Sequence, residues 1–153
     1  MRVAVGSDHA GYELKKRALE WLTIRGVEVL DLGPVEYDAK DDYPDFARAV
    51  AESVGSGGAD LGLLVCSTGV GSCIAANKVP QVRAALCHDS FSARMSREHN
   101  DANVLCLGAN IVGPSLAREI VEAWLSGDFS GEKRHRRRVA KIAEMEMLLR
   151  PKQ

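Results

Sequence analysis

The side chains best suited to chemistry follow a short apolar segment near the middle of the chain. Leu63-Leu64-Val65 ends at the thiol of Cys66, and a glycine-rich segment of small residues runs from Ser67 to Gly71. Small residues allow backbone N–H groups to approach a bound anion closely, and a helix beginning near Ser72 would add the positive end of its dipole at the same place. Cys66 is therefore a candidate thiolate, which could serve as a nucleophile or as a general base.

Further reactive side chains follow two other apolar segments. Ser7-Asp8-His9 comes directly after residues 2–6, and His88-Asp89 comes directly after residues 82–87. In an open parallel sheet, ligands bind beyond the carboxyl ends of the strands. These groups are therefore predicted to lie with Cys66 at one edge of such a sheet.

His99 and Asn100 differ because they precede an apolar segment, residues 104–107, instead of following one. This order would place both side chains at the opposite edge of the sheet in their own subunit. If His99 takes part in the chemistry, we expect it to reach a neighbour's pocket across a dimer interface.

Each candidate also has a structural alternative. Asp8 could cap the first helix, because a carboxylate at a helix N-terminus satisfies free N–H groups, and His9 could be a solvated loop residue. The basic segment from Arg134 to Arg138 could be a solvated charged face, which is the default for such a cluster. A nucleic-acid arm is disfavoured, because no aromatic residue interleaves with these arginines to stack on bases.

The four cysteines are Cys66, Cys73, Cys87 and Cys106. They form no Cys-x-x-Cys pair and have no histidine beside them at zinc-site spacing, so we expect no metal site. Cys87 and Cys106 end or interrupt apolar segments, which favours reduced, buried and inert thiols.

The glycine-rich segment matches neither of two common nucleotide-binding motifs. After Gly69-Val70-Gly71, Ile74 stands where G-x-G-x-x-G needs a third glycine, although Asp89 lies at about the distance of a ribose-binding acid. A G-x-x-x-x-G-K-[ST] loop is also missing, because Lys78 is displaced and no Ser or Thr follows it. What remains is an anion-binding turn that holds a thiol.

The elements that must position these residues alternate regularly. Short apolar segments typical of strands are separated by segments whose apolar residues recur at helical spacing. Because parallel strands need crossover connections, this alternation predicts an α/β protein with a parallel sheet and helices on both faces. The expected strands are 2–6, 27–33, 61–65, 82–87 and 104–107, and residues 99–103 are expected to form a loop.

A last helix is predicted over about residues 135–149, with no strand after it. Its apolar positions are Val139, Ile142, Ala143, Met147 and Leu148. A helix appended to a completed α/β sandwich often packs on a second subunit, so we expect a homodimer.

The composition limits the classes of function. With 153 residues, the chain is expected to form a single domain, 1–153, that is large enough to bury a core. A net charge of -1 and a pI near 6.4 give no bias toward nucleic acid or an anionic membrane, so phosphate recognition would be local. No apolar segment approaches the ~20 residues of a membrane span, and Met1 leads directly into a strand-like segment; we therefore expect no signal peptide and a cytoplasmic protein.

Several separated motifs occur in order over essentially the whole chain. They are Gly6-Ser7-Asp8-His9-Ala10-Gly11, Asp42-Tyr43-Pro44-Asp45, Cys66-Ser67-Thr68-Gly69-Val70-Gly71 with Ile74-Ala75-Ala76-Asn77-Lys78, and Ser96-Arg97-Glu98-His99-Asn100-Asp101-Ala102-Asn103. In this combination they resemble the type B ribose-5-phosphate isomerases, a family that includes allose- and galactose-6-phosphate isomerases. The resemblance implies a Rossmann-like α/β/α sandwich, working as a homodimer or a dimer of dimers with sites shared between subunits. It also implies chemistry that needs no metal and no nicotinamide.

The resemblance further implies roles around the thiol. Cys66 would be the base that moves a proton between C1 and C2 of a sugar phosphate, and Thr68 would assist. The backbone N–H groups from Ser67 to Gly71 would stabilise the enediolate, a role in which a single donor is typically worth about 3 kcal/mol.

Other roles implied by the resemblance belong to side chains outside this segment. His99 would help to open the furanose ring, Asp8 would accept a hydroxyl proton and Asn100 would bind sugar oxygens. The phosphate would be held by His9, Arg134 and Arg138, since guanidinium groups suit the geometry of a phosphate.

Two positions depart from the family pattern. Some relatives carry a glutamate base at the position of Ser72 and lack the thiol; here Ser72 cannot take a proton, which leaves Cys66 as the base. At Asn110 many relatives have an arginine that contributes to phosphate or sugar binding, and Arg136 or Arg137 could compensate for it.

Two other functions stay open at this point. The chain could isomerise a different sugar phosphate, such as allose 6-phosphate or a tetrose phosphate, because residue identities do not determine the depth of a pocket. It could also be a non-catalytic module that binds a nucleotide or another phosphorylated ligand, because a fold alone does not determine activity.

Overall fold

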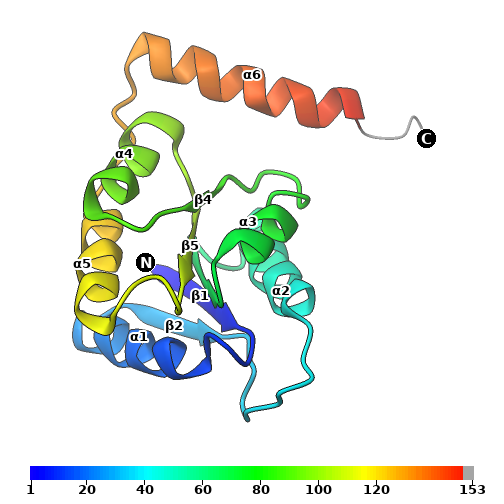
Figure 1. The fold of residues 1–153 in the computed structure, drawn as a ribbon. Helices are drawn as coiled ribbons and strands as arrows, with labels where there is room; N and C mark the ends of the chain where they lie inside the picture. Colours follow the sequence, from blue (N-terminus) through cyan, green and yellow to red (C-terminus); the bar gives the residue numbers. More distant parts are fainter. Residues whose placement is uncertain (150–153) are drawn as a thin grey trace.

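The computed structural model describes residues 1–149, in which strands and helices alternate up to α5 (Figure 1). The strands are β1 (Arg2–Ser7), β2 (Glu28–Asp31), β3 (Leu61–Cys66), β4 (Ala84–Leu86) and β5 (Val104–Gly108). The helices are α1 (Tyr12–Ile24), α2 (Tyr43–Gly55), α3 (Val70–Ala76), α4 (Ser90–Asn100), α5 (Pro114–Leu125) and α6 (Lys133–Leu149). The predicted α/β class is confirmed.

The five strands form one parallel sheet in the order β2-β1-β3-β5-β4. β3 lies in the middle and all of its residues are buried, which explains its continuous apolar sequence. Ser7 in β1 pairs with Val65, and Cys66 pairs with Gly108 in β5. The carboxyl ends of β1, β3 and β5 therefore lie at the same edge of the sheet.

Helices cover both faces of the sheet, which gives three layers (Figure 1). On one face, a cluster of buried side chains joins α1, α4 and α5 to the strands and includes Leu63, Leu105 and Trp124. On the other face, α2 and α3 pack on a second cluster that includes Val50 and Leu64. Because full burial of an aliphatic side chain stabilises a fold by about 1.5–3 kcal/mol, these clusters hold the strand ends in fixed positions.

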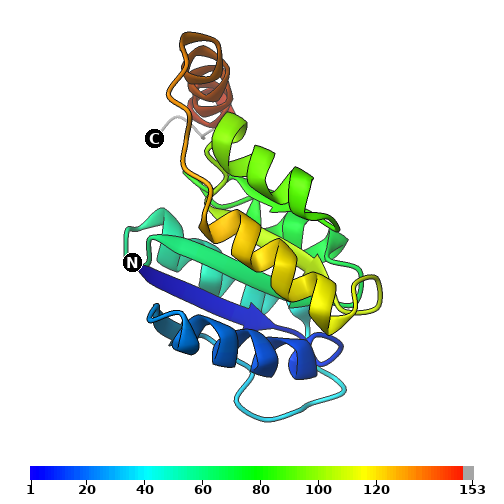
Figure 2. The ribbon, with the colours of Figure 1, turned by 90° about the vertical axis from the view of Figure 1, so that its left-hand side faces the viewer.

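Helix α6 lies apart from this sandwich, beyond α4 (Figures 1 and 2). It contacts α4, and the Gln81 N–H donates to Glu146 Oε2 at 2.9 Å. The helix begins at Lys133, slightly before the predicted start, and it leaves Ile142 and Met145 exposed. The predicted terminal helix is present, with apolar side chains that this chain does not cover.

Strand β4 is shorter than the predicted segment 82–87 and forms an edge of the sheet. The side chain of Asn77 closes that edge, because its Oδ1 accepts from the Ala84 N–H at 2.9 Å and its Nδ2 donates to the Ala84 carbonyl oxygen at 3.0 Å. Because the Asn77 amide pairs with both the N–H and the carbonyl oxygen of Ala84, fewer backbone groups of this edge are free to pair with another strand.

The prediction of a loop over residues 99–103 is wrong at its start, because α4 continues through His99 and Asn100. The helix ends only at Asp101, whose backbone is left-handed with φ 49°. An aspartate tolerates this conformation and stops the helix. His99 and Asn100 are therefore held on the last turn of a helix.

Candidate active site

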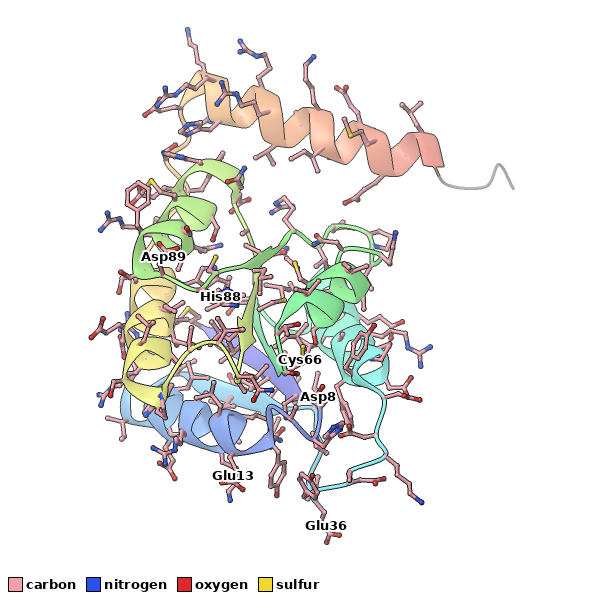
Figure 3. All side chains as sticks on the ribbon, viewed as in Figure 1. Asp8, Glu13, Glu36, Cys66, His88 and Asp89 are labelled. Carbon is pink, nitrogen blue, oxygen red and sulfur yellow. The ribbon has the colours of Figure 1, made fainter. Side chains whose placement is uncertain are left out.

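The carboxyl ends of β1 and β3 carry a carboxylate and a thiol. These strands are neighbours, and the Asp8 N–H donates to the Val65 carbonyl oxygen at 3.3 Å. Figure 3 shows Asp8 and Cys66 close to each other at this edge, where Asp8 is 7% and Cys66 4% exposed. The prediction that the ends of these two strands lie together is confirmed. The chemical roles of Asp8 and Cys66 stay predictions.

A backbone amide points at the Cys66 sulfur. The Gly69 N–H donates to Cys66 Sγ at 3.1 Å, and Gly69 has a left-handed backbone with φ 79°. A Cβ atom at Gly69 would lie 2.4 Å from Leu86 Cδ1 and 2.9 Å from the Leu107 carbonyl carbon. Only glycine fits here, and the turn that it makes directs an N–H donor at the candidate base.

Helix α3 begins at Val70, two residues earlier than the predicted start near Ser72. The left-handed turn at Gly69 allows the helix to begin directly after it. The Val70 N–H donates to Thr68 Oγ1 at 3.4 Å. Two amides of the proposed anion cradle, those of Gly69 and Val70, therefore have partners inside the loop, and a bound anion would compete with them.

Neighbouring segments hold the glycine-rich loop from two sides. Asn110 Nδ2 donates to Ser67 Oγ at 2.9 Å, and the Asn110 N–H donates to the Ser67 carbonyl oxygen at 3.0 Å. On the other side, a Cβ at Gly71 would lie 2.6 Å from Tyr43 Cζ at the start of α2. Asn110 thus braces the loop in this chain.

Asp8 supports the start of α1 as well as facing the edge of the sheet. Its Oδ1 accepts from the Gly11 N–H at 2.9 Å, directly before the helix. A Cβ at Gly11 would lie 2.3 Å from the Val65 carbonyl oxygen, so the loop after β1 lies tightly against β3. Asp8 therefore supports the start of α1, as the capping alternative expects. Its carboxylate also lies at the same edge of the sheet as Cys66.

His9 is held by an aspartate from a distant loop. One oxygen of Asp41, Oδ1, lies 3.0 Å from the His9 backbone nitrogen and 2.6 Å from ring Nδ1. The hydrogen bond with Asp41, together with the negative charges of Asp41, Asp8 and Asp38, raises the pKa of His9 against partial burial. His9 does lie in a loop with its side chain 36% exposed, as the solvated alternative expects, but Asp41 also holds its ring.

His88 and Asp89 follow β4 (Figure 3). Asp89 caps α4, because its Oδ1 accepts from the Ser92 N–H at 2.7 Å and its Oδ2 lies 2.7 Å from Ser92 Oγ. The hydrogen bond from the Ser92 backbone N–H is the largest cause of the lowered pKa of Asp89. Nε2 of His88 is buried and has no hydrogen-bond partner among the described residues. Asp89 is accounted for by the helix cap.

His99 and Asn100 lie at the opposite edge of the sheet from Cys66. Helix α4 ends at Asn100, shortly before β5 begins at Val104, whereas Cys66 pairs with the last residue of β5. The Asn100 carbonyl oxygen accepts from Arg83 Nε at 3.2 Å. The predicted separation of His99 from the thiol within one chain is confirmed.

His99 lies against a second histidine from α6. The ring centroids of His99 and His135 are 4.3 Å apart. His135 is 2% exposed, and its Nδ1 is 2.7 Å from Ser130 Oγ. Burial, followed by the charges of His99 and Arg134, lowers the pKa of His135. The imidazole of His99 thus has a neutral neighbour on one side at neutral pH.

Arg134 and Arg138 are exposed on the first turns of α6. Their spacing of four residues puts both on one face of the helix. Arg134 Nε forms an ion pair with Glu132 Oε2 at 2.9 Å. These arginines belong to the α4–α6 end of the molecule with His99, so one chain carries its two groups of candidate residues at two separate places.

Within residues 1–149, no group of three or more His, Cys, Asp or Glu side chains is placed to hold a metal ion. The helices in this described part of the chain are too short or too polar to cross a membrane.

The parallel α/β sandwich is that of a class of sugar phosphate isomerases, as comparisons with known proteins show. A family model described as Ribose/Galactose Isomerase matches residues 3–142. The chain belongs to the Ribose/Galactose Isomerase family.

Three relatives illustrate the similarity. The structure of Clostridium thermocellum ribose-5-phosphate isomerase B has a TM-score of 0.95 and 51% identity, covering 98% of this chain and 100% of that one. Ribose-5-phosphate isomerase B from Mycoplasma genitalium, solved with bound ribulose-5-phosphate, has a TM-score of 0.92 and 46% identity, with coverage of 95% and 96%. D-erythrulose-4-phosphate isomerase from Pectobacterium atrosepticum is 41% identical over 131 residues, 86% of each chain.

Three residues of this region were not identified from the sequence. Asp41, Tyr43 and His135 meet His9, Gly71 and His99, respectively, through contacts between distant segments. Tyr43 lies in a motif quoted for the family resemblance, but no pattern in the sequence indicated which groups it would contact.

Proposed function

We propose that the chain interconverts D-ribose 5-phosphate and D-ribulose 5-phosphate through an enediolate; the broader activity, that of an aldose–ketose isomerase, follows from its family. The observation that carries the proposal is the Cys66 thiol, which receives the Gly69 N–H at 3.1 Å and shares its edge of the sheet with Asp8. Relatives named as ribose-5-phosphate isomerase B, one with bound ribulose-5-phosphate, support this choice of substrate.

In the proposed reaction, the Cys66 thiolate removes the proton from C2 of the open-chain aldose. The electron pair forms the C1–C2 double bond and the negative charge moves to O1, where N–H groups from Ser67 to Gly71 stabilise it. Asp8 accepts the proton of the C2 hydroxyl and passes it on to O1, with Thr68 assisting this transfer. The Cys66 thiol then returns its proton to C1, which gives the ketose without any net change in protons.

A second subunit would complete the site. His99 of the partner subunit would open the furanose ring and its Asn100 would bind sugar oxygens. His9 would hold the phosphate together with Arg134 and Arg138. The separation of His99 from Cys66 within one chain and the uncovered Ile142 and Met145 on α6 support a homodimer or a dimer of dimers. Light scattering that finds only monomers would contradict this assembly.

The test of the base is Cys66→Ala, with Cys73→Ala as the matched control on the neighbouring helix. Loss of a general base typically lowers a rate by about 10²- to 10⁴-fold, so we expect Cys66→Ala to be nearly inactive and Cys73→Ala to stay active. Binding of inorganic phosphate and the melting temperature should change little. Full isomerase activity in Cys66→Ala would refute the assignment.

A different sugar phosphate is the second candidate substrate. The relative named D-erythrulose-4-phosphate isomerase favours a shorter substrate, and the neutral Asn110 amide that donates to Ser67 Oγ supplies no positive charge for a phosphate. A comparison of kcat/KM for four-, five- and six-carbon aldose phosphates decides between them. A preference for a four- or six-carbon compound would overturn ribose 5-phosphate as the substrate.

A further inference from the structure

One carboxylate oxygen fixes both the backbone and the ring of His9. Asp41 Oδ1 accepts from the His9 N–H at 3.0 Å and lies 2.6 Å from Nδ1. Two contacts to a single acceptor leave the imidazole little freedom to rotate. When Nδ1 donates to Asp41, the other ring nitrogen, Nε2, is left to meet a ligand.

Asp41 itself is well held. Its side chain is only 7% exposed, and its N–H donates to the Asp38 carbonyl oxygen at 3.1 Å. Farther back in the same loop, the buried Lys15 donates from Nζ to the Pro34 carbonyl oxygen at 2.8 Å and to Asp31. The loop that carries Asp41 is therefore anchored to α1 and β2.

The second oxygen of Asp41, Oδ2, is buried and has no hydrogen-bond partner within residues 1–149. His9 is thus the cationic side chain that Asp41 meets in this part of the chain. A buried carboxylate needs such a partner, because an unpaired charge away from water is costly. The geometry makes Asp41 and His9 a unit in which the ring takes the positive charge.

The other charged groups that face His9 also favour its protonated form. Asp8 and Asp38 add negative charge, and the Tyr37 ring meets the imidazole edge-on, with centroids 6.3 Å apart. Together with the hydrogen bond that Asp41 accepts, which is the largest cause, these carboxylates raise the pKa of His9. Protonation therefore persists to higher pH than it would for a free histidine.

We propose that Asp41 is a positioning residue for phosphate recognition, holding the His9 ring as an imidazolium with its Nε2–H directed at the phosphate of the substrate. This inference rests on the proposed function, in which His9 binds that phosphate. A charged donor forms a shorter and stronger hydrogen bond to phosphate than a neutral one does. Asp41 would thus act on substrate binding through His9, without touching the reacting carbons.

The first experiment is an NMR titration of His9 in the full chain and in Asp41→Asn, with Asp38→Asn as the matched control. His9→Gln identifies the His9 signal among the four histidines. We expect the pKa of His9 to fall clearly in Asp41→Asn and to change little in Asp38→Asn. An unchanged titration of His9 in Asp41→Asn would overturn the proposal. Asp41→Ser provides a second neutral variant if the asparagine variant does not fold.

The second experiment measures KM for ribose 5-phosphate against pH. At a pH between the His9 pKa values that the first experiment finds for Asp41→Asn and for the native chain, we expect Asp41→Asn to raise KM by up to about tenfold, the worth of one charge-assisted hydrogen bond. At about pH 5.5, His9 is protonated in both proteins, so the ratio of the two KM values should approach one. Titration of the substrate phosphate is common to both proteins and cancels in the ratio. A ratio independent of pH would contradict the proposal.

A double-mutant cycle separates this role from a purely structural one. If Asp41 acts through His9, Asp41→Asn should raise KM much less in a His9→Gln background than in the native chain. Equal effects in both backgrounds would overturn the proposal. The His9 titration needs no turnover, so it tests the effect of Asp41 on His9 even if the native chain is inactive. Inactivity of the native chain on ribose 5-phosphate would refute the proposed function instead.

Discussion

The rings of His99 and His135 lie with their centroids 4.3 Å apart and their planes inclined at 42°. Two imidazoles at this distance cannot both be protonated without electrostatic repulsion. His135 is the buried member of the pair, so it is the one that stays neutral. The neutral ring lies against the residue proposed to open the sugar ring.

This pair predicts a loss of stability in mild acid. The pKa of His135 is lowered by burial and by its cationic neighbours, so below about pH 6.5 the unfolded chain takes up a proton before the folded chain does. Stability should therefore fall as the pH drops from about 7 toward the pKa of the folded state, and His135→Gln should reduce this slope. Urea denaturation at several pH values tests it, and equal slopes in both proteins would contradict it.

Gly69→Ala should damage both the fold and the activity. The substitution forces a side chain into a left-handed position already occupied by Leu86 and Leu107, which should lower the free energy of unfolding by about 2–5 kcal/mol. Gly57 is the matched control: its φ is also 79°, but a Cβ there meets nothing within 4 Å, so Gly57→Ala should cost only about 1–2 kcal/mol. If denaturant titrations found the same loss in free energy of unfolding for Gly69→Ala and Gly57→Ala, steric crowding at Gly69 would be refuted as a cause.

Lys15 and Lys16 offer a second matched pair. Lys15 is 1% exposed and donates to both oxygens of Asp31, whereas Lys16 meets Glu13 on the surface. Because Asp31 keeps some access to water, Lys15→Met should lower the free energy of unfolding by about 2–3 kcal/mol. Lys16→Met should change it by no more than about 0.5 kcal/mol. Similar melting temperatures for both variants would refute a structural role of Lys15.

Cys73 should be the first thiol to react with iodoacetamide. The Cys106 thiol, followed by a backbone contact at Leu86 and the Asn77 amide, lowers the pKa of Cys73 to about 7 against partial burial. Cys87 is buried, which raises its pKa to about 11. Labelling of Cys73 should accelerate up to about pH 7 and then level off. Mass spectrometry of the labelled peptides checks this, and earlier labelling of Cys87 would contradict it.

The architecture could be predicted from the sequence because it depends on local patterns. A strand buried on both faces needs a continuous apolar segment, as in Leu63-Leu64-Val65, and parallel pairing needs the helices between such segments. Errors occurred at the ends of elements. The start of α3 depends on the left-handed turn at Gly69, and the end of α4 depends on the conformation of Asp101.

The supporting residues of the candidate site could not be predicted in this way. Asp41 meets His9 across 32 positions of sequence, and no periodicity indicates that the loop after β2 folds back over the loop after β1. In the sequence, His135 stands within the basic segment from Arg134 to Arg138, and nothing there indicates that it is buried. Its burial against His99 depends on how α6 leaves α5, which is a matter of tertiary packing.

The placement of Cys66 and His99 at opposite edges of one sheet has a genetic consequence. If each site takes its thiol from one chain and its histidine from the other, a chain with Cys66→Ala and a chain with His99→Asn are each inactive alone. A mixed dimer of the two would still contain one site in which both residues are native, so random mixing should restore about one quarter of the sites. Two defective alleles of this gene would then complement each other when they are expressed in the same cell.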